Sequence, residues 1–146
     1  MRVSASASPA LRATLLALRT VDRDVRRDVR QQTRGVARPE WERALDAAAR
    51  TTQESRMIAD TARIAVSDQN VRVRAGRGRT PKLSGGATPT TTAKGFEFGS
   101  NRYAQFPRPR RAGPFYRTVA NMGPRLLALW TQTTLRRIHL SLEGRR

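Results

Sequence analysis

Side chains that carry acid–base, nucleophilic or metal chemistry are scarce in this sequence. His139 is the only histidine, there is no cysteine, and the chain after residue 73 contains just two carboxylates, Glu97 and Glu143. General acid–base catalysis, nucleophilic catalysis and metal binding each need two or more such groups held together. We therefore expect no catalytic residue, no metal ligand and no cofactor, and we predict that the protein is not an enzyme.

Positive charge, almost all of it from arginine, dominates the composition. Basic residues outnumber acidic ones 29 to 11 over 146 positions, for a formal net charge of +18. Mutual repulsion on this scale disfavours a compact monomer unless salt, a polyanion or an acidic partner offsets it. Half of the excess falls between residues 71 and 111. We predict that this basic loop and arm contacts a partner through Arg72, Arg74, Arg77, Arg79, Lys82, Arg102, Arg108, Arg110 and Arg111.

The length fits one domain, residues 1–146, and the first third of the chain predicts helical structure. A short strand is expected around Val3, and a helix is expected from Pro9 onward. Its apolar residues recur at helical spacing: Leu11, Leu15, Leu18, Val25 and Val29. Gly35 and Pro39 then either kink one long helix or separate it from a second helix that begins at Glu40.

Two short alternating runs in the middle of the chain predict a β-hairpin. They are residues 63–66 and 71–74, and the four residues between them are typical of turns. The alternation places one set of side chains against the helices, namely Ile64, Val66, Val71 and Val73.

The segment that follows has a different composition. Residues 75–94 are rich in glycine, threonine and proline and show no periodicity, so we predict a flexible basic loop. Phe96 to Gly99 is expected to form a short strand with alternating side chains. Pro107 and Pro109 predict an extended arm that ends at Gly113.

Pro114 suits the first position of a last helix, because proline there needs no N–H partner and already has a helical φ. Gly123-Pro124 is expected to break or kink this helix. Apolar residues surround it near Leu126, Leu127 and Trp130, which predicts a subunit or partner interface. Packing within the chain is the alternative.

These elements give an α+β fold. We expect a long N-terminal helix, kinked or split, a small antiparallel sheet with a hairpin and a long basic loop, and a C-terminal helix packed on the sheet. No apolar run approaches the length of a membrane span, so no membrane contact is expected.

The order of these elements, with two short motifs, resembles a known family. The motifs are Phe96-Glu97-Phe98-Gly99-Ser100 and, at the start of the last helix, Pro114-Phe115. Together they look like the neck or tail-completion proteins of long-tailed bacteriophages, relatives of the lambda Z protein. The family usually carries an Arg-Thr-Gly-x-Leu turn before its hairpin, whereas this chain reads Arg56-Met57-Ile58-Ala59-Asp60.

The resemblance implies a structural virion protein at the head-tail junction of a tailed phage or phage-like particle. It implies a homo-oligomeric ring, expected to be hexameric, that joins the head connector to the tail. The implied neighbours are the head-closure (stopper), tail terminator and tail tube proteins, with non-specific contact to packaged DNA. The implied location is the virion neck, after assembly in the host cytoplasm.

A second hypothesis needs no resemblance. The chain would be a basic nucleic-acid-binding protein of ribosomal or nucleoid type, whose residues from Arg72 to Arg111 neutralise phosphates. Such binding weakens steeply with salt, whereas ring formation through apolar surfaces does not.

Overall fold

A computed structural model describes residues 1–4, 13, 16, 19, 21–67, 70–108 and 113–143. The regular elements are β1 (Arg2–Ser4), α2 (Arg23–Ala48), α3 (Thr52–Glu54), a π-helical turn η1 (Ser55–Ala59), β2 (Arg63–Val66), β3 (Val71–Arg74), a 3₁₀ turn η2 (Ser84–Gly86), α4 (Pro89–Phe98) and α5 (Pro114–Glu143). The predicted α+β class is confirmed. The predicted helix start at Pro9, with Leu11, Leu15 and Leu18, lies outside the described residues.

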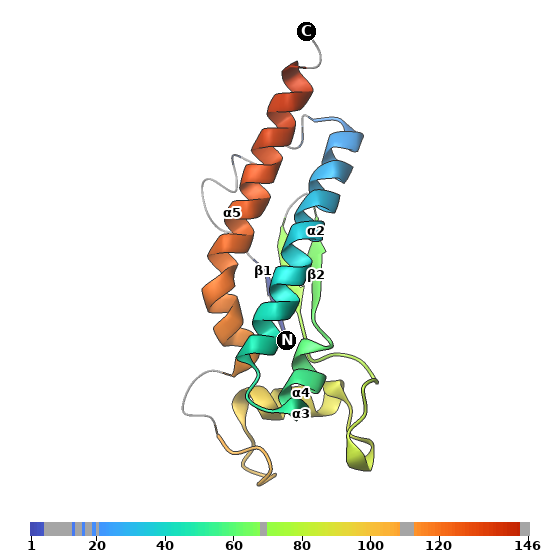
Figure 1. The fold of residues 1–146 in the computed structure, drawn as a ribbon, viewed down its shortest axis with the longest axis vertical. Helices are drawn as coiled ribbons and strands as arrows, with labels where there is room; N and C mark the ends of the chain where they lie inside the picture. The colour runs from blue at the N-terminus through green and yellow to red at the C-terminus, as the bar shows by residue number, and fades with distance from the viewer. Residues whose placement is uncertain are drawn as a thin grey trace.

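Two long helices, α2 and α5, run antiparallel side by side in front of the sheet (Figure 1). The face that α2 buries repeats every fourth residue: Val29, Thr33, Ala37, Trp41 and Leu45. Against it α5 places Phe115, Leu126 and Trp130, all buried. The contact is also tied at two points, because Arg117 donates to the carbonyl oxygen of Ala48 at 2.6 Å and Arg137 donates to Gln32 at 3.1 Å.

Neither internal proline ends its helix. Pro39 lies inside α2 and Pro124 inside α5, so no second helix begins at Glu40 and no break follows Gly123. A proline ring collides with the carbonyl group four residues earlier and removes one hydrogen bond. Burial of the apolar face on both sides of each proline outweighs that local cost, which a sequence pattern does not reveal.

The sheet has three strands in the order β1-β3-β2, all antiparallel. The predicted hairpin is confirmed, with Ile64 opposite Val73 and Val66 opposite Val71. Ile64, Val71 and Val73 are buried and Val66 is half-buried. The strand expected around Val3 is also confirmed, since β1 pairs with β3.

The strand predicted for Phe96 to Gly99 is wrong, because these residues form the end of α4. The loop predicted for residues 75–94 is shorter than expected, because residues 89–94 belong to α4. Pro89 occupies the first turn, and the Thr88 backbone N–H donates to Thr91 Oγ1 at 3.0 Å. This local start to a helix competes successfully with the strand-like alternation of Phe96, Glu97 and Phe98.

Candidate interaction surfaces

Glu97 joins the end of α4 to the beginning of α5. Its side chain is 1% exposed, yet both carboxylate oxygens have partners. Oε2 accepts from the backbone N–H of Phe115 and Oε1 from that of Tyr116, each at 2.9 Å. The first N–H groups of a helix lack intrahelical acceptors, and the helix dipole favours negative charge there. Glu97 therefore caps α5 from a position 18 residues earlier in the chain.

Glycines make this joint possible. A Cβ atom at Gly113 would lie 2.6 Å from Glu97 Cδ, and one at Gly99 would lie 2.6 Å from the Arg108 Cα atom. Gly99 also has φ +73°, a left-handed conformation that suits glycine. The predicted motif segments, Phe96 to Ser100 and Pro114-Phe115, thus form one packed unit, which we call the Glu97 joint.

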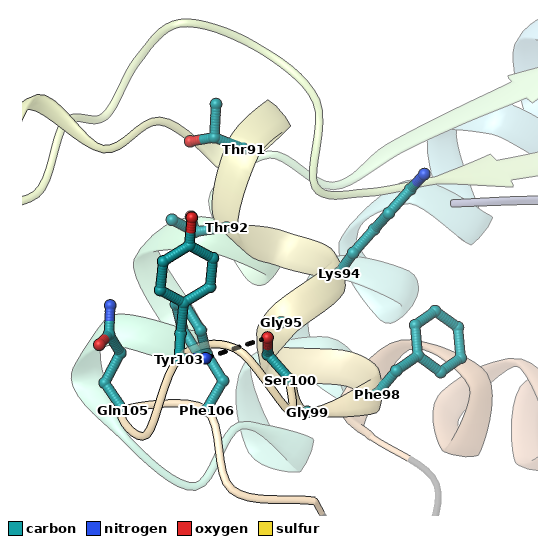
Figure 2. Close-up of a pocket in the computed structure, with 10 residues that line it drawn as sticks. All are labelled: Thr91, Thr92, Lys94, Gly95, Phe98, Gly99, Ser100, Tyr103, Gln105 and Phe106. Atoms are coloured by element: carbon teal, nitrogen blue, oxygen red, sulfur yellow. Dashed lines mark hydrogen bonds between the residues drawn. The ribbon is translucent and has the colours of Figure 1, made fainter.

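An open hollow of about 450 Å³ lies beside the Glu97 joint (Figure 2). It is lined by the C-terminal part of α4 and the loop after it, and Ser100 Oγ accepts from the backbone N–H of Tyr103 at 3.3 Å. In Figure 2, Lys94 and Phe98 point away from Tyr103 and Gln105, on opposite sides of α4.

Large aromatic side chains remain exposed around this joint. Phe98 and Tyr116 lie 5.6 Å apart between ring centroids, and both are exposed. Tyr103 is exposed as well, with the Arg102 guanidinium 5.5 Å from its ring centroid. Exposed apolar groups gathered in one region are typical of a contact surface for another protein.

The predicted interface on the last helix is wrong for two of its three residues. Trp130 and Leu126 are buried in the chain's own core, and Leu127 is half-buried. The alternative of packing within the chain therefore holds for Leu126 and Trp130. The apolar side chains that α5 leaves exposed lie nearer its C-terminal end: Leu135, Leu140 and Leu142. The sequence showed an excess of apolar residues but not which of them α2 would cover.

The residues of the predicted basic loop and arm differ in their exposure. Arg77, Arg79, Lys82, Arg102 and Arg108 are exposed, whereas Arg72 and Arg74 on β3 are half-buried. Arg110 and Arg111 lie outside the described residues. The predicted basic region did not include a group of arginines on α2, namely Arg27, Arg30, Arg34 and Arg38. Residues spaced three or four apart lie on one face of a helix, so the spacing of these arginines could have indicated the group.

The described part of the chain contains no group of three or more histidine, cysteine or acidic side chains that could hold a metal ion. His139 is exposed on α5, and its Nδ1 atom lies 3.5 Å from Glu143 Oε2. In the same described ranges, no helix has the length and apolar character needed to cross a membrane.

Comparison of the chain with models of known protein families, with curated proteins and with solved structures gives no match.

Proposed function

We propose that the chain is a structural, non-catalytic subunit of the neck of a tailed phage or phage-like particle. The subunits form a ring, expected to be hexameric, that joins the head connector to the tail. Its neighbours are the head-closure, tail terminator and tail tube proteins, and it resides in the virion after assembly in the host cytoplasm.

The Glu97 joint is the observation that carries this proposal. The two motifs behind the family resemblance are separated by 13 residues in the sequence, yet Glu97 and Phe115 meet through a hydrogen bond of 2.9 Å. If the two short motifs matched the family only by chance, we would not expect them to meet in a single buried contact. Their contact supports reading them as one structural unit, although Phe96 to Phe98 are helical here and do not form the strand that the resemblance implied.

Exposed apolar side chains at both ends of α5 support an assembly role. The Phe98–Tyr116 pair lies beside the N-terminal end of α5, and three exposed leucines lie toward its C-terminal end. A ring subunit meets two copies of itself and further proteins above and below, so it needs several separate contact surfaces. Apolar contacts of this kind contribute to association roughly in proportion to the area they bury.

The test is the size of the particle that the full chain forms. We expect sedimentation and negative-stain images to show closed rings, either alone or after mixing with the head-closure and tail terminator proteins encoded beside it. Replacing the exposed leucines (Leu135→Ser, Leu140→Ser and Leu142→Ser together) is expected to shift the particle toward monomer. The control carries Ala128→Ser and Gln132→Ser at exposed positions of the same helix and keeps the ring.

A monomer in every one of these mixtures would overturn the proposal. So would a leucine variant that forms rings as well as the unmodified chain, because the α5 surface would then play no part.

A further inference from the structure

Arginines of α2 and β3 gather along the open edge of β2. One hollow of about 620 Å³ is lined by Arg27, Arg30, Arg34 and Arg38 of α2 and by residues 64–66 of β2. A second, of about 320 Å³, is lined by Arg72 and Arg74 of β3. The two hollows share Arg30, Ala65 and Val66 in their linings, so they adjoin, and we call them together the arginine groove.

No acidic side chain lines the arginine groove in the described part of the chain. Acidic residues line the neighbouring hollow, where Glu42, Asp46 and Asp60 accompany Arg38, Arg43 and Arg63. The groove therefore has one sign of charge and a defined end near Arg38. Low-dielectric walls lined by a single sign of charge focus the field on an approaching ion of opposite sign.

Arg27 and Arg38, near the two ends of the α2 row, can exchange their present partners for another anion. Arg27 pairs with Asp24 at 3.3 Å and Arg38 with Glu42 at 2.8 Å, but these side chains are largely exposed. Exposed ion pairs contribute little and exchange readily for other anions.

We propose that the arginine groove binds the phosphate backbone of duplex DNA. The first and last of the four α2 arginines are 11 positions apart, which is roughly 16 Å of helix at about 1.5 Å per residue. The arginines therefore form a linear row and do not surround a single ion. A row of this kind follows a phosphodiester strand, and the arginine fork suits phosphate oxygens. The groove lining contains no aromatic side chain on which an unpaired base could stack, which disfavours single strands.

Binding of DNA in the arginine groove does not require the proposed ring. DNA binding by the groove and assembly through α5 use different residues, so either can fail while the other stands. The α2 part of the groove lies outside residues 72–111, where the sequence placed the phosphate contacts, and only Arg72 and Arg74 belong to both regions.

The experiment measures binding of the full chain to a fluorescently labelled duplex of mixed sequence, by anisotropy, between about 50 and 200 mM salt. Four to six phosphate contacts predict that log affinity falls against log salt with a slope of roughly −3.6 to −5.4. The groove variant carries Arg27→Gln, Arg34→Gln and Arg38→Gln. Its slope is expected to be shallower by roughly 2 to 3, and its affinity at least about tenfold lower.

A matched control removes the same net charge from the exposed loop instead. It carries Arg77→Gln, Arg79→Gln and Arg102→Gln and is expected to stay within about twofold of the unmodified chain. A third variant replaces the groove arginines with lysine (Arg27→Lys, Arg34→Lys and Arg38→Lys). It is expected to retain the salt slope, because lysine also binds phosphate as a point charge.

Four outcomes would overturn the proposal. The first two are duplex binding that does not depend on salt and an equal loss of duplex affinity in the groove and loop variants. The other two are failure of the lysine variant to bind the duplex and tighter binding of a single strand than of the duplex. Loss of polyglutamate binding in the groove variant with duplex binding unchanged would also overturn it, and would assign the groove to an acidic protein.

Discussion

Glu97 illustrates how one side chain connects two distant segments. Burying a carboxylate is costly unless it is hydrogen-bonded, and here two backbone N–H groups at the positive end of α5 supply the bonds. The same contact satisfies two donors that would otherwise be buried without partners. The carboxylate and the start of α5 thus stabilise each other.

Replacing Glu97 is expected to destabilise the fold in graded steps. Glu97→Ala leaves the N–H groups of Phe115 and Tyr116 without acceptors and opens a cavity, so we expect a loss of roughly 2 to 4 kcal/mol. Glu97→Gln keeps one acceptor oxygen but loses the charge, for roughly 1 to 2 kcal/mol. Urea unfolding monitored by circular dichroism measures both values.

Glu143→Gln is the control, since Glu143 is exposed at the far end of α5. We expect it to stay within about 0.5 kcal/mol of the unmodified chain. If Glu97→Ala changed stability no more than this control, the carboxylate would not hold α5 in the way described.

At the scale of elements, α2 and α5 stabilise each other through faces that repeat every fourth residue. Their contact runs past Pro39 in one helix and Pro124 in the other, so tertiary packing overrides the local tendency of proline to end a helix. The result is an uninterrupted α2, which brings Arg27, Arg34 and Arg38 into one row along the groove.

Removing the internal prolines is expected to stabilise the protein. Pro39→Ala and Pro124→Ala each restore a backbone hydrogen bond, and we expect gains of roughly 1 to 3 kcal/mol, reduced by the greater freedom of the unfolded chain. Pro89→Ala is the matched control, because Pro89 lies in the first turn of α4 where no such bond is missing. Thermal and urea unfolding compare the three.

Equal effects of the three substitutions would contradict this account. In that case the cost of proline would not depend on its place in the helix, and the packing of α2 on α5 would not be opposing it.

At the scale of the whole molecule, charge is the dominant feature. The formal net charge is +18, while the described ion pairs are exposed and join residues three or four apart on one helix. Such pairs do little to offset repulsion between distant arginines. The isolated chain therefore folds against its own positive charge, and an anionic partner would relieve that repulsion.

Added salt is expected to stabilise the isolated chain. The screening length falls from about 30 Å at 0.01 M to about 8 Å at 0.15 M ionic strength, so repulsion between distant arginines weakens. We expect the urea midpoint to rise over this range. Urea is the suitable denaturant because it is uncharged and leaves the ionic strength unchanged.

The groove and loop variants, each with three fewer positive charges, should gain less from salt than the unmodified chain. A midpoint that falls with salt, or does not change, would show that repulsion is not a major cost of folding.

Local patterns allowed part of this structure to be predicted. The hairpin of residues 63–66 and 71–74, the strand at Val3 and the helix start at Pro114 each depend on a few neighbouring residues, so the sequence alone indicated them. The scarcity of histidine, cysteine and paired carboxylates likewise followed from composition.

Other features depended on contacts between residues far apart in the chain. The continuity of α2, the burial of Leu126 and Trp130, and the arginine groove all follow from how α2 packs on α5 and on β2. The alternation around Glu97 suited a strand, yet those residues belong to the helix that begins at Pro89, and only the fold shows that α4 places the carboxylate at the start of α5. Sequence alone determined the local elements and the charge; which faces became core and which became surface was decided only by tertiary packing, because burial depends on partners that periodicity does not identify.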